Sequence, residues 1–524
     1  MKIYFIAICG KGSGNLAVFL KQQGHEVYGS EYSEKTFYPP IADLIRENRI
    51  PVDFGFDPDK ITPDIDLVIL GGAALIHDKN NPQVKRAKEL GIEVITTARG
   101  IGRFISKDNH ISVVGNHGKT TTTALIAKTL MSCNEDVSYF IGEAPFEFAN
   151  SIYSGTSSWS VAEGDEHPSL GQEEGGKFLY HKPKHVVFIS ADWDHKNVYR
   201  TLQSYLDAYI QLMRILPSDG RVIACLDGMN VCEVLQQSGI SNLMTFYTIS
   251  ELKNMVGGIE PSVLEHNIEI LVEEYKNRFP DLFMQADYVY YIGEVDYRWM
   301  PDSIRFLVKR YDLNTRNKEK IGYFETHLIG QIGLENSLAT IATLLTLGFD
   351  TECVKKGVGE FKGVRRRLEM IYDREYKVIN DFAHSPIKIK RTLQSVRTKF
   401  YDRKIFVIFQ VGQSALKEKR TFYELKNVFN LADYVIIPRV MPDVNSPEQF
   451  FGKDYRDLIK EGASEEQIFL KPQNVFYTPL ATHLKSVLEN NLEHNDVIVI
   501  MSSTDNTEII ELVKGLQVKS LPIN

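Results

Sequence analysis

The sequence of 524 residues is poor in the features that mark secreted and membrane proteins. It holds five cysteines, an odd number without a CxxC pair, which predicts reduced thiols in a cytoplasmic protein. No apolar run approaches the roughly 20 residues that span a bilayer. The start, MKIYFIAICGKGSG, has too short an apolar run for a signal peptide. We therefore expect a cytoplasmic protein without membrane insertion.

A cluster of basic residues is also missing. The formal net charge is -8 and the charges are spread along the chain, which argues against a nucleic-acid partner. Apolar residues make up 43% of the chain, so each part of it can bury a core. At about 150 residues a domain, the length predicts three or four domains.

Short β-rich runs alternate with helical patterns in three successive parts of the sequence. Parallel sheets with crossover helices produce this alternation. The predicted fold class is therefore α/β, with a Rossmann-like N-terminal domain at 1–108, a central P-loop domain at 109–371 and a Rossmann-like C-terminal domain at 372–524. Within the central domain, a charged helix and hairpin strands predict an insertion at about 250–325.

The run SVVGNHGKTTTTALIAK, residues 112–128, has the pattern of a strand, a glycine turn and a helix. Backbone N–H groups in such a turn point toward an anion, and the helix dipole favours its negative charge. Lys119 is suited to neutralise β- and γ-phosphates, and the Thr120 hydroxyl to bind Mg²⁺. The full motif would have glycine at position 113, which is valine here. We predict a triphosphate site at this shortened turn.

Two later strands end in acidic residues, at what should be the same sheet edge as the glycine turn. They deliver Glu163, Asp165 and Glu166, and then Asp192, Asp194 and His195. Carboxylate oxygens, with an occasional imidazole, suit Mg²⁺ held against phosphates. Such cations offset the charge that develops in phosphoryl transfer. The acidic strand ends therefore predict a magnesium site.

A second glycine turn opens the chain, in IAICGKGSGN. Gly10, Gly12 and Gly14 lie between a strand and a helix, while Ser30 and Glu31 end the next strand. This arrangement resembles a dinucleotide fingerprint, although the last glycine comes one residue early. Two ligands stay open from the residues alone: NAD, which would make an oxidoreductase and leave the first turn unexplained, or the diphosphate of a nucleotide sugar.

Taken alone, GVRRRLE at 363–369 would be a charged linker and NDFAHSP at 380–386 a turn before a proline. Together with GNHGKTTTT, AEGDE and the Asp194-His195 pair, in this order, the segments resemble the Mur ligase family. Its members are cytoplasmic ATP-dependent ligases that build the peptide of bacterial cell-wall precursors. The resemblance covers nearly the whole chain and implies ATP and Mg²⁺ as cofactors.

The resemblance also implies a substrate. The first domain resembles the branch that binds UDP-N-acetylmuramate directly, and FYPPIADLIRE (37–47) and NNPQV (80–84) resemble its peptide-recycling member. The implied reaction joins UDP-N-acetylmuramate to L-alanyl-γ-D-glutamyl-meso-diaminopimelate through an acyl phosphate, in peptidoglycan recycling. Ligation of L-alanine is the alternative within the branch.

By the same resemblance, three residues are expected to act in catalysis: Lys119, His195 and His384. Contacts to ATP are expected from Gly115, Asn116, Gly118, Lys119, Thr120, Thr121, Asn336, Arg367 and Asp381. The UDP part would lie against Gly10, Gly12, Ser30 and Glu31. The expected magnesium ligands are Thr120, Glu163 and His195.

Four segments depart from the family pattern. Ile332 and Gly333 replace a His-Asn pair expected near the base, and Ser190 replaces an asparagine. The segments 410–415 and 501–506 lack the arginine and the glycines of the third domain. These departures suggest an altered amine pocket, and they leave open a relative that binds nucleotide and UDP-sugar without catalysis. We expect a monomer or a weak homodimer.

Overall fold

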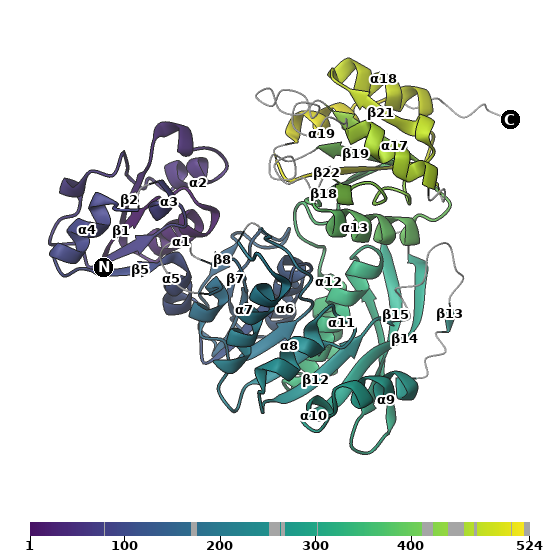
Figure 1. The fold of residues 1–524 in the computed structure, drawn as a ribbon, viewed down its shortest axis with the longest axis horizontal. Helices are drawn as coiled ribbons and strands as arrows, with labels where there is room; N and C mark the ends of the chain where they lie inside the picture. Colours follow the sequence, from purple (N-terminus) through teal and green to yellow (C-terminus); the bar gives the residue numbers. More distant parts are fainter. Residues whose placement is uncertain are drawn as a thin grey trace.

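The computed structural model describes residues 1–77, 79–168, 175–196, 198–250, 262–263, 268–300, 302–410, 423–438, 455–465, 469–504 and 506–517. Three α/β units follow one another along the chain, and each is built around its own sheet (Figure 1). The predicted fold class is thereby confirmed.

The first sheet is entirely parallel, with the strand order β3-β2-β1-β4-β5. Its strands are β1 (Lys2–Ile6), β2 (Glu26–Glu31), β3 (Val52–Phe54), β4 (Leu67–Leu70) and β5 (Glu93–Thr96). Its helices are α1 (Lys11–Gln22), η1 (Glu34–Thr36), α2 (Ile41–Glu47), η2 (Pro58–Lys60), α3 (Ala74–His77), α4 (Pro82–Glu89) and α5 (Thr97–Phe104). The strand order reverses beside β1, so the first glycine turn lies at the switch point where such sheets bind ligands.

The central sheet runs β16-β15-β14-β12-β11-β10-β6-β9-β7-β8, and β13 pairs with β14. Its strands are β6 (Asn109–Val114), β7 (Ser138–Phe140), β8 (Ile152–Tyr153), β9 (Trp159–Glu163), β10 (His185–Phe188), β11 (Arg221–Cys225), β12 (Leu243–Thr248), β13 (Ser262–Val263), β14 (Ala286–Met300), β15 (Ser303–Asp312) and β16 (Lys318–Thr326). The helices are α6 (Lys119–Ser132), η3 (Lys177–His181), α7 (Leu202–Arg214), α8 (Val231–Ser238), α9 (Ile268–Arg278), α10 (Pro280–Phe283), α11 (Gly330–Thr346) and α12 (Thr351–Glu360).

The helix and hairpin strands expected at about 250–325 are present as α9, β14 and β15. Strand β14 joins the central sheet parallel to β12, and β15 and β16 extend it antiparallel. These residues therefore widen the central sheet toward the third domain. Residues 251–261 and 264–267 lie outside the described part of the chain.

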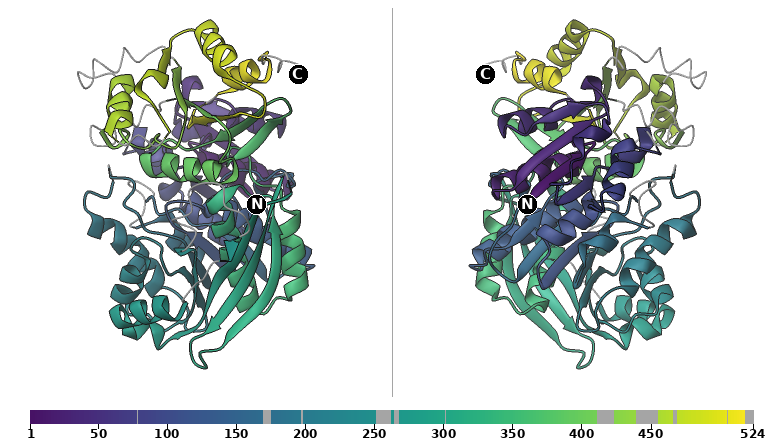
Figure 2. Two further views of the ribbon diagram at one scale, coloured as in Figure 1. Left: turned by 90° about the vertical axis from the view of Figure 1, so that its right-hand side faces the viewer. Right: turned by 90° about the vertical axis from the view of Figure 1, so that its left-hand side faces the viewer.

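The third sheet has the order β17-β18-β22-β19-β20-β21, in which only β17 is antiparallel to its neighbour. Its strands are β17 (Glu369–Asp373), β18 (Lys377–Asp381), β19 (Ile405–Gln410), β20 (Tyr434–Pro438), β21 (Val475–Thr478) and β22 (Val497–Ser502). Its helices are α13 (Pro386–Lys399), α17 (Tyr455–Glu465), η5 (Pro472–Asn474), α18 (Ala481–Asn491) and α19 (Thr507–Lys514). The predicted boundary between 371 and 372 falls inside β17, and α13 lies between the third sheet and the central domain (Figure 2).

The prediction that every cysteine is reduced is wrong for two of them. Cys133, which ends α6, forms a disulfide with Cys353 of α12. The two residues are 220 positions apart and meet because α12 packs along α6. Cys9, Cys225 and Cys232 are buried thiols. Spacing along the chain could not reveal a pair that depends on helix packing.

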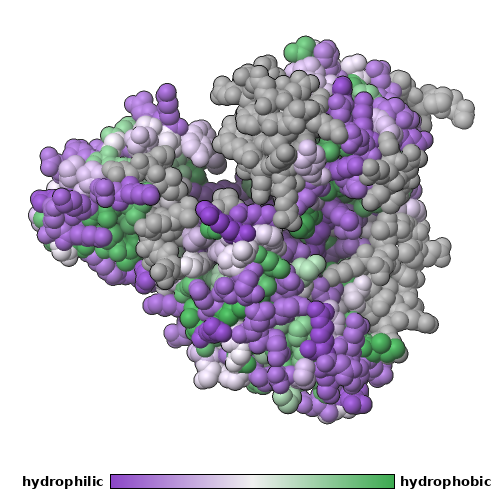
Figure 3. All heavy atoms as spheres, in the orientation of Figure 1, coloured by the Kyte–Doolittle hydropathy of each residue, from purple (hydrophilic) through white to green (hydrophobic). Residues whose placement is uncertain are grey.

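None of the described helices combines the length and the apolar composition that crossing a bilayer requires. The face in Figure 3 is mostly polar, with small apolar patches scattered over the first and central domains.

Candidate active site

The predicted phosphate turn joins the end of β6 to the start of α6. Gly118 precedes the helix in the left-handed region, with φ 71°, and Gly115 has φ 139°. A Cβ added to Gly118 would lie 2.8 Å from Asn336 Oδ1, so both space and backbone conformation require glycine. The turn therefore brings its backbone close to a ligand, and the first N–H groups of α6 are available to bind an anion.

Lys119 lies at the centre of this turn. Its Nζ is 2.8 Å from Glu166 Oε2 and 2.5 Å from the carbonyl oxygen of Gly115. Burial lowers the pKa of this ammonium, but the carboxylates of Glu166, Glu163 and Asp165 outweigh burial and raise it. Burial likewise raises the pKa of Glu166, but the charge of Lys119 outweighs burial and lowers this pKa. The turn thus holds a charged lysine at neutral pH.

Thr120 and Glu163, two of the three expected magnesium ligands, line the same cavity. Glu163 ends β9, and its Oε2 accepts a hydrogen bond from the Gly142 N–H at 3.0 Å. A hydroxyl and a carboxylate beside a phosphate turn are the hard oxygen donors that Mg²⁺ prefers. These two residues fit a magnesium ion that phosphate oxygens would also coordinate.

The third expected ligand, His195, faces a different partner. Its Nε2 is 3.5 Å from Glu166 Oε1. Burial lowers its pKa, but Glu166 and Asp194 raise it above the usual 6.5. The structure therefore places His195 beside the acidic residues that follow β9, and its role as a magnesium ligand stays a prediction. Among the described residues, His, Cys, Asp and Glu side chains do not gather into a cluster of three that could hold a metal.

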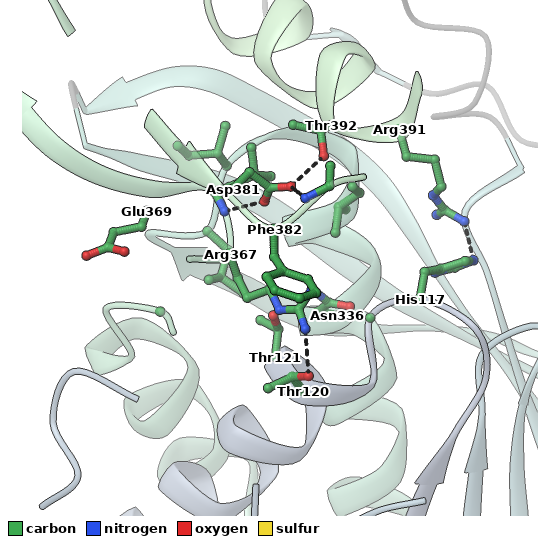
Figure 4. A pocket seen from close by; sticks show the side chains of 18 of the residues that line it. His117, Thr120, Thr121, Asn336, Arg367, Glu369, Asp381, Phe382, Arg391 and Thr392 are labelled. Carbon is green, nitrogen blue, oxygen red and sulfur yellow. Dashed lines mark hydrogen bonds between the residues drawn. The ribbon is translucent and has the colours of Figure 1, made fainter. Parts of the chain in front are cut away.

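The phosphate turn opens into a cavity of about 250 Å³ that the central and third domains line together (Figure 4). Arg367, at the junction, donates to Thr120 Oγ1 at 3.4 Å. Asp381 ends β18 and is buried, which raises its pKa. Its carboxylate accepts the Leu368 N–H at 2.7 Å and the Thr392 hydroxyl at 3.1 Å. Asp381 therefore holds the junction in the shape that directs Arg367 to the phosphate turn.

His384 and Asn336 occupy supporting positions. The Nδ1 of His384 lies 2.8 Å from the carbonyl of Phe382, and burial lowers the pKa of the imidazole to about 4. The buried Asn336 lines the cavity, and its Oδ1 accepts a hydrogen bond from the Thr122 hydroxyl at 3.1 Å. His384 is consequently neutral at pH 7, and Asn336 ties α11 to the phosphate helix.

One wall of the cavity is apolar where the family pattern has a His-Asn pair. Ile332 and Gly333 stand at those positions at the start of α11. Leu328 and Phe146 line the cavity with them. An apolar wall of this kind suits the face of a base, whereas a side-chain amide would read its edge.

The other departures bear on the same site. The Ser190 hydroxyl donates to Asn116 of the phosphate turn, which was expected to contact ATP. Arg366 donates to two backbone carbonyls of the 501–506 segment, both at 2.8 Å, and so fixes the junction to the third sheet. Residues 411–415 and 505 lie outside the described residues.

The four residues expected to hold the UDP part gather around the first glycine turn. Ser30 is buried and donates to Gln83 Oε1 at 2.6 Å. Glu31 accepts the N–H of Cys9 at 2.9 Å, directly before Gly10 of the turn. Gly10 caps α1, while Gly12 lies in its first turn. Ser30 and Glu31 thus brace the turn from the neighbouring strand.

Two cations from the third domain were missed by the sequence analysis. On α13, Lys388 Nζ lies 3.4 Å from Asp194 Oδ2. Arg391 pairs with Glu335 of α11 and donates to the Nε2 of His117 in the phosphate turn. Both side chains line the cavity. The available signal was their three-residue spacing, which places them on one face of a helix such as α13.

A glycine turn with a half-buried lysine, nearby carboxylates and the arginines Arg367 and Arg391 defines an enzyme that handles nucleotide phosphates. Three domain models of one family match the chain in order: the catalytic domain at 2–109, the middle domain at 113–344 and the glutamate ligase domain at 366–504. The chain belongs to the Mur ligase family. It is an ATP-dependent ligase of peptidoglycan synthesis that forms amide bonds.

Similar proteins fall into two groups. The UDP-N-acetylmuramate–L-alanyl-γ-D-glutamyl-meso-2,6-diaminoheptandioate ligase of Escherichia coli K12 is 26% identical over 401 residues, 76% of each chain. The UDP-N-acetylmuramate–L-alanine ligase of Acetivibrio thermocellus is 25% identical over 97% of this chain and 95% of its own.

Solved structures agree on the fold. The UDP-N-acetylmuramate-alanine ligase of Thermotoga maritima has a TM-score of 0.66 at 20% identity, over 98% of this chain and 97% of its own. A murein peptide ligase of Psychrobacter arcticus has a TM-score of 0.60 at 20% identity, over 99% of this chain and 100% of its own.

Proposed function

We propose that the protein joins UDP-N-acetylmuramate to L-alanyl-γ-D-glutamyl-meso-diaminopimelate in the cytoplasm, as a step of peptidoglycan recycling. The observation that carries this proposal is the position of the Tyr38-Pro39-Pro40 segment. The Cys9 thiol, beside the first glycine turn, donates to the Tyr38 carbonyl at 3.6 Å, and Tyr38 is 62% exposed. This segment resembles that of the recycling ligases, and the similar E. coli enzyme carries this activity in its name.

In the proposed reaction, the γ-phosphoryl group of ATP passes to the lactyl carboxylate and leaves ADP. The peptide amine then attacks the acyl carbon, loses a proton and expels inorganic phosphate. The backbone N–H groups of the turn and Lys119 would hold the phosphates, while Thr120 and Glu163 would hold Mg²⁺. When bound, Mg²⁺ would neutralise part of the phosphate charge. The protein's part is mainly positioning and electrostatics.

His384 is our candidate for a group beside the reacting atoms. Its Nδ1–H donates to the Phe382 carbonyl, which leaves Nε2 as the acceptor nitrogen. Its pKa of about 4 keeps that nitrogen unprotonated at neutral pH. Third-domain residues such as this one approach the central domain only when the two domains meet, which also excludes water from an acyl phosphate.

Ligation of L-alanine is the second candidate, and a specific observation favours it. The L-alanine ligase of A. thermocellus aligns over 97% of the chain, whereas the E. coli recycling ligase aligns over 76% of it, as does the L-alanine ligase of Fusobacterium nucleatum. The amine pocket must therefore be identified by its substrate.

Phosphate release decides between them. Purified protein is incubated with ATP, Mg²⁺ and UDP-N-acetylmuramate, with the tripeptide, with L-alanine or with neither. We expect release only with the tripeptide, and loss of it in Lys119→Ala. Lys128→Ala, a charge removal farther along α6 where the lysine pairs with Glu360, is the matched control and should retain activity. Phosphate release with L-alanine but not with the tripeptide would establish the second candidate. No release with either amine would indicate a protein that binds its ligands without catalysis.

A further inference from the structure

Helix α13 meets the central domain with a stripe of polar side chains. Lys388, Arg391, Ser395 and Lys399 follow at helical spacing and lie on one face. Each contacts the central domain: beyond the pairs of Lys388 and Arg391, the Ser395 hydroxyl accepts the N–H of Ile332 at 3.1 Å. Contacts of this kind can exchange partners, unlike a packed apolar face.

Arg391 is the member of this stripe that reaches the phosphate turn. Its guanidinium pairs with Glu335, whose side chain is only 3% exposed, and donates to His117. His117 lies directly before Gly118 and Lys119, within the turn itself. Figure 4 shows the guanidinium of Arg391 in contact with His117, while that of Arg367 contacts Thr120 at the other end of the turn. The two arginines therefore bracket the place where backbone N–H groups gather phosphates.

Chemistry favours a phosphate over the present partners of Arg391. A guanidinium offers a planar fork that matches phosphate oxygens in bidentate fashion, with charge-assisted hydrogen bonds. A neutral imidazole nitrogen accepts only one hydrogen bond. Glu335 supplies the counter-charge that a half-buried guanidinium needs until a more highly charged anion enters the cavity.

We propose that Arg391 binds the terminal phosphate of ATP, exchanging Glu335 for phosphate oxygens when the triphosphate fills the turn. Arg391 thereby adds a guanidinium from the third domain to the phosphate site of the central domain. The inference rests on the ATP-dependent ligase activity and is independent of which amine is the substrate.

The test compares nucleotide binding alone, without UDP-sugar or amine, so that an error about the amine cannot affect it. Affinities for a non-hydrolysable ATP analogue and for ADP, both with Mg²⁺, are measured by calorimetry. Arg391→Ala should lower the affinity for the analogue by about tenfold or more, because charge-assisted hydrogen bonds are lost. The affinity for ADP should change by less than about twofold. Arg391→Lys should lie between, because it keeps the charge without the fork.

Two further variants make the outcome decisive. Lys390→Ala removes a charge from the exposed side of the same helix and should match the wild type for both nucleotides. Glu335→Gln removes the competing carboxylate and should raise the affinity for the analogue. The proposal is overturned if Arg391→Ala lowers the affinities for ADP and for the analogue equally, or if Glu335→Gln lowers the affinity for the analogue. Either result would mean that Arg391 and Glu335 form only a structural ion pair between the domains. Retained ADP binding shows that each variant is folded.

Discussion

The two interfaces of the central domain are built differently. Toward the first domain, helix α5 packs so closely on η3 that a Cβ added to Gly102 would lie 2.0 Å from the Tyr180 carbonyl. The Ser106 hydroxyl donates to the His181 carbonyl at 2.5 Å, and the ion pair of Lys11 with Glu143 lies more exposed. Toward the third domain, α11 packs on α13 just as closely, because a Cβ added to Gly330 would lie 2.3 Å from the Ser395 carbonyl oxygen. The side-chain contacts around it, however, include ion pairs that reach the nucleotide cavity, Lys388 with Asp194 and Arg391 with Glu335.

This difference indicates which interface moves during turnover. Both interfaces include close backbone contact, but only the one toward the third domain carries ion pairs beside the nucleotide cavity, and charged and polar contacts between domains are typical of interfaces that open and close. The nucleotide cavity lies at the charged interface, where a ligand's own charge can replace existing partners. The first domain is therefore expected to keep its place while the third domain responds to nucleotide.

The largest effect should come from the phosphate turn of the central domain, at Glu166. The side chain is 1% exposed and pairs with Lys119, whose side chain is 14% exposed. Glu166→Gln leaves that lysine without its main counter-charge, so we expect a loss of about 3–5 kcal/mol in the free energy of unfolding. Urea denaturation measures it. Asp165→Asn, which removes a neighbouring carboxylate from a more exposed pair with Lys177, should cost less than about 1 kcal/mol. Similar losses in both would mean that burial of the pair is unimportant.

Gly102→Ala should break the neutral interface. The added methyl group meets a backbone carbonyl that cannot rotate away, so α5 and η3 must separate. We expect about 1–3 kcal/mol of destabilisation, as for overpacked sites, seen as a lower unfolding temperature. Gly72→Ala, where an added Cβ meets nothing within 4 Å, is the control. Unchanged affinity for the ATP analogue would confirm that the two interfaces are independent, and a parallel loss of affinity would contradict it.

The neutral side should also be sensitive to acid. Burial lowers the pKa of His110 to about 3 and that of His181 to about 4, from the usual 6.5. As pH falls below 6.5, the unfolded chain takes up protons that the folded chain refuses, so stability present above pH 6.5 is lost toward pH 4. Between pH 7 and 5 we expect a loss of about 2 kcal/mol per histidine.

His181→Phe tests this assignment. It keeps an aromatic ring beside Phe140 and removes one titrating group, so the fall in stability between pH 7 and 5 should shrink by that histidine's share. His483→Phe, at an exposed position on α18, should leave the pH dependence as it is. The same slope in both variants would show that His181 titrates normally in the folded protein.

Only some of the features that distinguish the two interfaces could be predicted from the sequence. The phosphate turn and the acidic strand ends could be predicted because a local run of residues specifies strand, turn and helix. Lys119 and Glu163 accordingly lie at the cavity. The Arg391–Glu335 pair joins two helices whose contact depends on how the domains dock, and no local pattern encodes that. His195 lies beside Glu166, and its role as a metal ligand stays a prediction.

The smallest effect should come from Lys399, at the far end of the α13 stripe. Its ammonium donates to the carbonyls of Tyr297, Met300 and Ser303 at 2.8, 3.3 and 3.1 Å, where β14 turns into β15. Lys399→Met keeps the volume and removes these hydrogen bonds. Because water can replace the ammonium at partly exposed carbonyls, the net loss should be only about 1 kcal/mol. Faster hydrogen exchange confined to residues near the β14–β15 turn would reveal it. Lys390→Met, on the exposed side of α13, should show no such change, and equal effects in both would remove Lys399 from the contacts that hold the third domain.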